Sequence, residues 1–221
     1  MSENETKKIL ILGAGAMGSN IAANLSADLK NESEITVLDF DTVEERNVQA
    51  GTQFYMPEQV GMSKVEALQY NIYKWFGKEI KTINQKLTRI WDLGPIIGGP
   101  YVGSNGERVL STGNTESPNL VIDCFDNYSA RKLIQDYLSD WNIALLHCGF
   151  SPQMTFEIKW AENYKVPENS PEGSRDICEM PGAKAFITRV ASLGATSARE
   201  FIVDGNKIGF LGNKYTTYKL D

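Results

Sequence analysis

Short apolar runs alternate with amphipathic stretches at the start of the chain. Residues 8–12 (KILIL) and 34–39 (EITVLD) have the length and composition of buried strands. Between them, apolar side chains recur over residues 17–29 at the spacing of one helix face. The order strand, helix, strand predicts a βαβ unit, and the crossover of such a unit favours a mostly parallel sheet.

The rest of the chain continues this alternation. Further strands are predicted at 79–87, 119–124 and 143–148, and further helices at 63–76, 127–141 and 183–203. Ser63 and Glu66 have the spacing of a capping box at the start of the helix at 63–76. Near the C-terminus, residues 153–160 alternate in the manner of an antiparallel strand, and residues 207–220 are typical of a hairpin.

Residues 92–117 interrupt the pattern because they are rich in Gly, Pro, Ser and Asn. We expect an irregular, flexible insert with one hairpin around Asn105-Gly106, which either gates a neighbouring site or is an idle surface loop. The elements together predict an α/β fold with a Rossmann-like, mostly parallel sheet. Helices are expected on both faces, and antiparallel strands at the C-terminal side. We expect residues 1–221 to form a single domain.

Composition excludes several classes of protein. The formal net charge of −6 argues against a nucleic-acid-binding protein, whose surface needs an excess of Lys and Arg. No apolar run approaches the ~20 residues of a membrane helix, and the polar start (MSENETKK) is unlike a signal peptide. Cys124, Cys148 and Cys178 form no CxxC pair, so neither a disulfide framework nor a structural zinc is expected. These features indicate a reducing, cytoplasmic location.

A glycine-rich turn joins the first predicted strand to the first predicted helix. Gly13, Gly15 and Gly18 form a GxGxxG, in which the glycines permit a tight turn, approach of a phosphate and close packing of helix on strand. The helix N-terminus offers unpaired N–H groups to an anion. Asp39 ends the second predicted strand and suits a ribose hydroxyl. This context predicts a nucleotide site, although the glycines could also serve packing alone.

Three further motifs follow the glycine loop in order. They are VLDFDTVEERN (37–47), GMSKVEAL (61–68) and VIDCFDN (121–127). With the loop they resemble the ThiF/MoeB/HesA (E1-like) family of activating enzymes, from about residue 7 to residue 203. In that family an acid-x-acid-x-Val run and an Asn follow the second strand. A Gly-x-x-Lys opens the next helix, and an Asp-x-x-Asp-Asn closes the fourth strand.

The resemblance implies an adenylyltransferase that joins a carboxylate to the α-phosphate of ATP and releases pyrophosphate. It implies that Asp39 binds the ribose, Lys64 the phosphates and Asp126 a Mg²⁺ ion. The other residues that it places at the nucleotide are Gly13, Gly15, Gly18, Asp41, Asn47 and Asn127. Two alternatives stay open, because Lys64 can lie on a solvated helix face and Asp126-Asn127 can cap a helix.

One position departs from the family pattern. The family carries an Arg three residues after the Asn that follows the second strand, and this chain has Ala50 there. Loss of a guanidinium beside a triphosphate removes a charge-assisted contact. Either another cation replaces it, such as Arg46 or an Arg of a second subunit, or catalysis is weakened.

Cys178 lies just before the predicted helix at 183–203, where the resemblance places a nucleophilic thiolate in some relatives. Arg175 and Lys184 would lower the pKa of this thiol, whereas Asp176 and Glu179 would raise it. Cys178 is therefore either a nucleophile or an incidental cysteine.

Three more residues invite a functional interpretation. His147 is the only histidine and lies near the end of a predicted strand, so it either touches a ligand there or is satisfied within the sheet. Arg131 is expected to pair with a carboxylate rather than to bind a phosphate. Cys124 is expected to be a small core residue inside a strand.

The resemblance thus implies an enzyme that uses ATP and Mg²⁺ to activate a C-terminal carboxylate. The substrate would be the tail of a small ubiquitin-like or sulfur-carrier protein, or a peptide, and the enzyme a homodimer. Two other functions stay open. A catalytically degenerate member would bind nucleotide or a partner, which Ala50 favours. An NAD-dependent dehydrogenase explains the glycine loop and Asp39, but not Lys64 or Asp126-Asn127.

Overall fold

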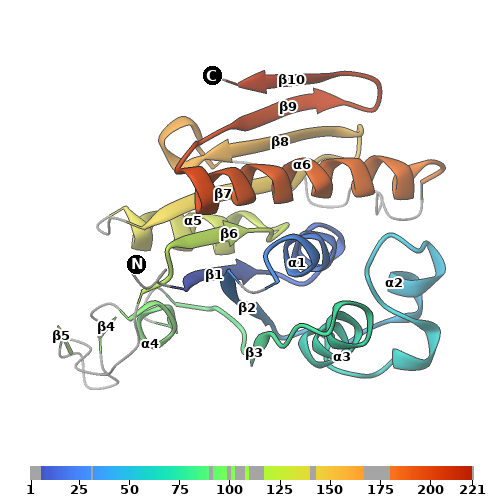
Figure 1. Cartoon of the computed structure of the whole chain (residues 1–221), viewed down its shortest axis with the longest axis horizontal. Coiled ribbons are helices and arrows are strands. Elements are labelled where there is room, and N and C mark those ends of the chain that lie inside the picture. Colours follow the sequence, from blue (N-terminus) through green and yellow to red (C-terminus); the bar gives the residue numbers. More distant parts are fainter. Residues whose placement is uncertain are drawn as a thin grey trace.

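In the computed structural model, an eight-stranded sheet forms the centre of the molecule (Figure 1). The structure describes residues 6–30, 32–89, 92–98, 101–102, 108–109, 117–139, 143–166 and 180–220. The strands, in their order across the sheet, are β10 (Thr217–Leu220), β9 (Gly209–Asn213), β8 (Thr155–Trp160), β7 (Ala144–Phe150), β6 (Leu120–Asp123), β1 (Lys7–Leu12), β2 (Ser33–Asp39) and β3 (Lys81–Asn84). The five strands from β7 to β3 are parallel, and β8, β9 and β10 are antiparallel to their neighbours.

Helices cover both faces of this sheet (Figure 1). The helices α1 (Ala16–Asp28), α3 (Lys64–Phe76) and α6 (Ala183–Asp204) pack on one face, and α4 (Gly94–Ile97) and α5 (Tyr128–Leu138) on the other. Strand β1 serves both layers, because Ile9 and Ile11 join the larger core cluster while Leu10 and Leu12 join the smaller one. A parallel strand buried on both faces reads as a continuous apolar run, which is what residues 8–12 are. The predicted fold class is confirmed.

Several predicted elements have different bounds in the structure. The strand predicted at 79–87 is only Lys81–Asn84, because β3 is an edge strand and its partner β2 ends at Asp39, opposite Asn84. The predicted antiparallel strand and the C-terminal hairpin are confirmed as β8 and the β9–β10 pair. Two short helices, α2 (Glu45–Gln49) and the 3-10 turn η1 (Pro57–Gln59), were not predicted.

The predicted capping box at Ser63 is wrong. Ser63 does precede α3, but its hydroxyl makes no capping hydrogen bond and is buried without a partner among the residues that the structure describes. The chain enters α3 through backbone contacts instead, because Ser63 forms a bridge with Thr42 and the Lys64 N–H donates to the Asp41 carbonyl at 2.9 Å. The start of α3 is therefore tied directly to the segment that follows β2.

The segment at 92–117 is only partly described. Its first residues form α4, which places Leu93 and Ile97 fully inside the smaller core cluster, so the prediction of irregular structure is wrong there. The strands β4 (Tyr101–Val102) and β5 (Arg108–Val109) pair antiparallel, and the turn predicted at Asn105-Gly106 lies outside the described residues. A short 3-10 turn, η3 (Ala161–Asn163), follows β8. Within the described ranges, no helix is both long and apolar enough to cross a membrane.

A buried lysine closes the C-terminal end of α1. Lys78 follows α3, is 5% exposed, and its ammonium donates to the carbonyls of Leu29, Lys30 and Ser33 at 3.1, 2.9 and 2.6 Å. The last carbonyls of a helix have no partner within the helix, so an ammonium at this end satisfies both the hydrogen bonds and the helix dipole. Lys78 thereby joins α3 to the turn between α1 and β2.

We predict that Lys78→Met lowers the free energy of unfolding by roughly 2 kcal/mol, because buried carbonyls lose a charged donor. Urea denaturation followed by circular dichroism measures this change. The matched control is Lys74→Met, because Lys74 is exposed on α3, the helix that Lys78 follows. Equal effects of the two substitutions would contradict the proposed role of Lys78.

Candidate functional site

The glycine loop connects β1 to α1, and its backbone conformation requires glycine at two positions. Gly13 has a positive φ of 95°, and a Cβ on Gly18 would lie 1.8 Å from the Gly13 carbonyl oxygen. A Cβ on Gly15 would meet nothing within 4 Å. Packing alone therefore accounts for Gly13 and Gly18, whereas Gly15 faces open space at the N-terminus of α1, where a phosphate could approach the backbone.

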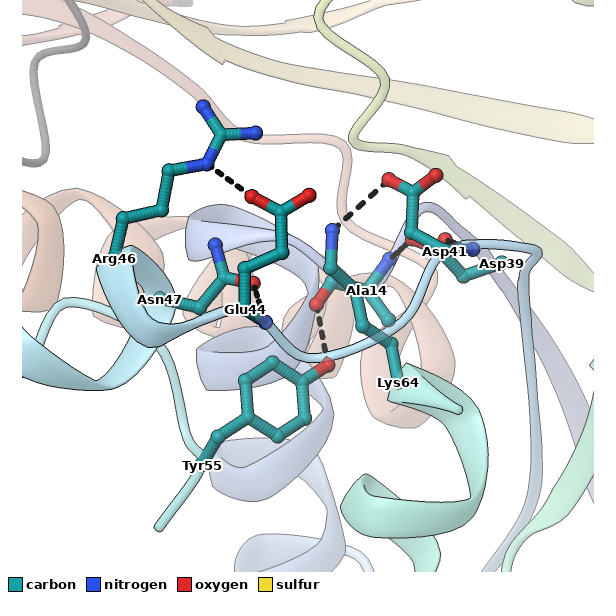
Figure 2. A network of polar contacts seen from close by, with 8 residues as sticks. All are labelled: Ala14, Asp39, Asp41, Glu44, Arg46, Asn47, Tyr55 and Lys64. Carbon is teal, nitrogen blue, oxygen red and sulfur yellow. Dashed lines mark hydrogen bonds and ion pairs between the residues drawn. The ribbon is translucent and has the colours of Figure 1, made fainter. Parts of the chain in front are cut away.

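Asp39, the last residue of β2, holds this loop from one side (Figure 2). The side chain is 6% exposed, and its Oδ2 accepts the Ala14 N–H at 2.6 Å while Oδ1 accepts the Asp41 N–H at 2.8 Å. The second bond is an Asx turn, which directs the chain out of the strand. The Asp39 carboxylate thus lies directly under the glycine loop, at the place predicted for a ribose ligand.

Tyr55 holds the loop from below (Figure 2). Its hydroxyl donates to the Ala14 carbonyl at 2.6 Å, so both polar groups of Ala14 are fixed by side chains. Burial, and after it the carboxylates of Asp39 and Asp41, raise the pKa of Tyr55 well above its usual value. The hydroxyl therefore remains a donor at neutral pH. Sequence reasoning missed Tyr55, because the chain separates it from the loop by about 40 residues.

Lys64 and Asp41 form an ion pair beside the loop (Figure 2). The Lys64 Nζ lies 3.0 Å from the Asp41 Oδ2; the lysine side chain is 11% exposed and the aspartate side chain 47%. The alternative that Lys64 lies on a solvated helix face is thus wrong. A nearly buried ammonium needs an anion, and a half-exposed carboxylate partner leaves room for a second anion to approach.

Asn47 and Arg46 lie on α2, which follows the segment carrying Asp41. The buried Asn47 side chain accepts the Glu44 N–H at 2.8 Å and so caps α2. Arg46 forms an ion pair with Glu44 (Figure 2). The capping box uses Glu and Asn in place of Ser or Thr with Glu, which is why the sequence did not reveal this helix.

A lysine lies over the turn where the family pattern expects an arginine. Ala50 ends α2 and packs against the larger core cluster. The next residue, Gly51, has a φ of 59°, and a Cβ there would lie 3.1 Å from the Lys184 Nζ. Lys184 is the second residue of α6, so the fold brings a cation from a distant part of the chain to this turn.

The segment from Asp126 to Asn127 joins β6 to α5. Asn127 caps α5, because its Oδ1 accepts the Ala130 N–H at 2.8 Å. Asp126 is exposed, and no hydrogen-bond or ion-pair partner of its carboxylate occurs among the described residues. The capping alternative therefore holds for Asn127 but leaves Asp126 available.

The described residues contain no cluster of three or more metal-ligating side chains. Such a cluster is not needed for nucleotide-bound Mg²⁺, which takes one or two carboxylates and completes its shell with phosphate oxygens and waters. The free carboxylate of Asp126 fits this requirement, and the half-exposed Asp41 offers a second oxygen ligand.

These residues meet at one edge of the sheet because β2, β1 and β6 are adjacent and parallel (Figure 1). Their C-terminal ends carry Asp39, the glycine loop and Asp123 respectively. The segment after β6 touches the loop, since a Cβ on Gly13 would lie 3.2 Å from the Cys124 carbonyl oxygen. The C-terminal edge of a parallel sheet is where open α/β folds bind ligands.

A cavity lies farther along the same edge, beyond β7. Its walls come from the β7–β8 turn, the β9–β10 turn and the start of α6, and its volume is about 520 Å³. The lining residues are Pro152, Gln153, Met154, Thr155, Met180, Pro181, Asn213, Lys214 and Tyr215. The lining is mainly apolar, in contrast to the charged groups near the glycine loop.

The remaining candidates lie inside the protein or outside its described part. His147 is fully buried and its Nδ1 lies 2.8 Å from the Asp123 Oδ2, so it lies inside the sheet and not at a surface that a ligand could touch; its Nε2 has no partner among the described residues. Arg131 pairs with Asp123 at 3.9 Å, as expected. Cys124 packs against the core as expected, but it directly follows β6 and does not lie inside the strand. Its hydrogen bond with Cys148, and then burial, raise the pKa of its thiol. Cys178 lies outside the described residues.

Comparison with known proteins identifies the family. A model described as the ThiF family matches residues 2–220. The chain belongs to the ThiF family. Similar ThiF-type proteins include the ubiquitin-like modifier-activating enzyme 5 of Caenorhabditis briggsae and that of Drosophila ananassae, each 28% identical over 146 and 156 residues respectively. Both matches cover 66% of this chain but only 31% and 34% of the relatives, so the chain spans about a third of their length.

Solved structures share the ThiF-type fold. The crystal structure of E. coli MccB with ATP matches with a TM-score of 0.71 at 14% identity, covering 97% of this chain and 63% of MccB. The crystal structure of PaaA matches with a TM-score of 0.69 at 15% identity, covering 99% of this chain and 64% of that protein. These likenesses bear on the fold, and the resemblance inferred from the motifs is confirmed by the family match.

We predict that Tyr55→Phe lowers the free energy of unfolding by about 1 kcal/mol, because the Ala14 carbonyl loses a buried donor. It should also raise the rate of amide hydrogen exchange in the glycine loop. Tyr215→Phe serves as the control, because Tyr215 is 83% exposed. If Tyr55→Phe changed neither stability nor exchange more than the control did, the role assigned to this hydroxyl would be wrong.

Proposed function

We propose that this protein is an ATP-dependent adenylyltransferase that activates a carboxylate and releases pyrophosphate. The observation that carries the proposal is the nearly buried Lys64 ammonium, which is paired with Asp41 beside the glycine loop. A dinucleotide-dependent dehydrogenase would use the loop and Asp39 but has no need for a cation at this position. Membership of the ThiF family supports the same choice.

In the proposed reaction, a substrate carboxylate oxygen attacks the α-phosphorus of ATP. A bond forms between these two atoms, and the bond from the α-phosphorus to the bridging oxygen breaks, so pyrophosphate leaves with the electron pair. Lys64 neutralises charge on the phosphate oxygens, and the N-terminus of α1 binds them through its N–H groups. Asp39 accepts a hydrogen bond from the ribose, and Asp126 would hold a Mg²⁺ ion that neutralises the leaving group.

The class of substrate is proposed from the relatives. The curated relatives are named as activating enzymes of ubiquitin-like modifiers, and MccB has been crystallised with MccA. We propose that the substrate here is likewise a C-terminal carboxylate, on a small ubiquitin-like or sulfur-carrier protein or on a peptide. The chain preceding that carboxylate would leave the nucleotide site along the sheet edge, toward the apolar cavity beyond β7. We also propose a homodimer, and Cys178 as a candidate acceptor of the activated carboxylate.

Ala50 favours a second candidate, a degenerate family member that binds nucleotide without catalysis. Against it, Lys184 lies over Gly51, directly beside the position that lacks the arginine. A lysine at a helix N-terminus is disfavoured by the helix dipole, so its ammonium would gain from a nearby anion. We propose that Lys184 provides the cation that Ala50 lacks, in preference to Arg46, which is paired with Glu44.

Catalysis is tested by pyrophosphate exchange into ATP in the presence of the carboxylate substrate. We predict that Asp126→Ala lowers the exchange rate by about a hundredfold or more, because the leaving group loses its metal-borne charge. The fold should remain intact, because the Asp126 side chain is exposed. Asp136→Ala on the exposed surface of α5 is the control. Exchange at the wild-type rate in Asp126→Ala would exclude the proposed role of this carboxylate.

We predict that Lys184→Met raises the KM for ATP about tenfold, the equivalent of one charge-assisted hydrogen bond. Steady-state exchange kinetics at varied ATP concentration measure this change. The control is Lys219→Met, which removes an exposed lysine from the edge strand β10. A KM equal to that of the control would show that Lys184 does not replace the missing arginine.

A further inference from the structure

Four polar side chains form a buried cluster beneath the segment that carries Asp126. They are Asp123 at the end of β6, Arg131 on α5, His147 on β7 and Tyr164 after η3. Asp123 and His147 are fully buried and face each other across the paired strands. Burial of a carboxylate and a guanidinium is costly unless their hydrogen bonds are satisfied, so the contacts of this cluster are informative.

Asp123 and Arg131 together fix the backbone of Phe125. The Asp123 Oδ1 accepts the Phe125 N–H at 3.0 Å, in the same Asx turn that Asp39 forms after β2. The Arg131 Nε donates to the Phe125 carbonyl at 2.6 Å. Both polar groups of the residue directly before Asp126 are therefore held by buried side chains. On the other side, Asn127 is held as the cap of α5.

The guanidinium of Arg131 is itself held in place. Its Nη1 donates to the Tyr164 hydroxyl at 2.9 Å and its Nη2 to the Cys148 carbonyl at 3.3 Å. Gly149 leaves the space for it, because a Cβ there would lie 2.7 Å from Nη2. Three donors in different directions require a planar fork, which a lysine does not provide.

His147 and Tyr164 complete the cluster. Because the Asp123 carboxylate accepts at Nδ1, the imidazole carries its proton there, and its Nε2 is buried without a partner among the described residues. The Tyr164 ring lies against the imidazole, with 3.8 Å between the ring centroids. Burial raises the pKa of Tyr164, so its hydroxyl stays neutral beside the guanidinium. The imidazole thus holds the Asp123 carboxylate, and the phenol holds the Arg131 guanidinium.

We propose that Asp123, Arg131, His147 and Tyr164 are positioning residues that orient the free Asp126 carboxylate for binding of a metal–nucleotide complex. This inference rests on the proposed function, in which Asp126 is the metal ligand. Buried ion pairs often stabilise a fold no more than apolar residues of similar volume would, so stability does not explain the cluster by itself. Substitution of residues that orient a metal ligand typically lowers metal affinity or activity about 10–100-fold.

The test measures Mn²⁺ affinity in the presence of a non-hydrolysable ATP analogue, by electron paramagnetic resonance of free Mn²⁺. Arg131→Lys keeps the charge but removes the fork, and is expected to weaken Mn²⁺ binding about 10–100-fold. Gly149→Ala should weaken it in the same direction, because the added methyl displaces the guanidinium without removing any group of the cluster. Affinity for the metal-free analogue should be unchanged in both variants.

One control variant and the variant Asp126→Asn decide the outcome. Arg199→Lys on α6 is the matched control and should bind Mn²⁺ as the wild type does, because Arg199 pairs with the neighbouring Glu200 away from the site. If Asp126→Asn weakens Mn²⁺ binding while Arg131→Lys and Gly149→Ala bind it as the wild type does, the positioning role is wrong and the proposed function stands. If Asp126→Asn also binds Mn²⁺ normally, both the metal role of Asp126 and the inference fail.

Discussion

Two buried carboxylates, at the ends of the strands on either side of β1, determine the shape of the site. Asp39 ends β2 and Asp123 ends β6, and each accepts the N–H of the residue two positions later. Strand β1 lies between these strands and carries the glycine loop. The two Asx turns direct the chain away from the sheet on both sides of the loop. Gly15 lies in the loop between the two turns, Asp41 follows the turn after β2, and Asp126 follows the turn after β6.

The two carboxylates differ in the groups that satisfy them. Asp39 accepts backbone N–H groups and faces the glycine loop, so it fixes the loop while staying close to an incoming ligand. Asp123 is fully buried, and its carboxylate pairs with an imidazole and a guanidinium inside the protein. Charged groups that remain for a ligand include Lys64 with Asp41, Lys184 and Asp126. A preorganised electrostatic site requires both: buried groups that are held in place, and charged groups beside them that can bind a ligand.

The sequence predicted the sheet and the glycine loop because both depend on local periodicity and on glycines at fixed spacing. It also predicted that Arg131 pairs with a carboxylate. The short helix α2 was missed because its capping pair, Glu44 with Asn47, is not the usual one. The contact of Lys184 with Gly51 joins segments that are distant in the chain, so no local sequence pattern predicts it. The same holds for the hydrogen bond between Tyr55 and Ala14, which depends on packing across the sheet edge.

Nucleotide binding by the purified protein tests the central claim most directly. Isothermal titration calorimetry with ATP–Mg²⁺ and, separately, with NAD distinguishes the two nucleotides that a glycine loop of this kind can bind. The proposed function predicts that one ATP–Mg²⁺ binds per chain and that NAD does not bind. Binding of NAD without binding of ATP–Mg²⁺ would contradict it and would make the protein a dinucleotide-binding member of the same fold.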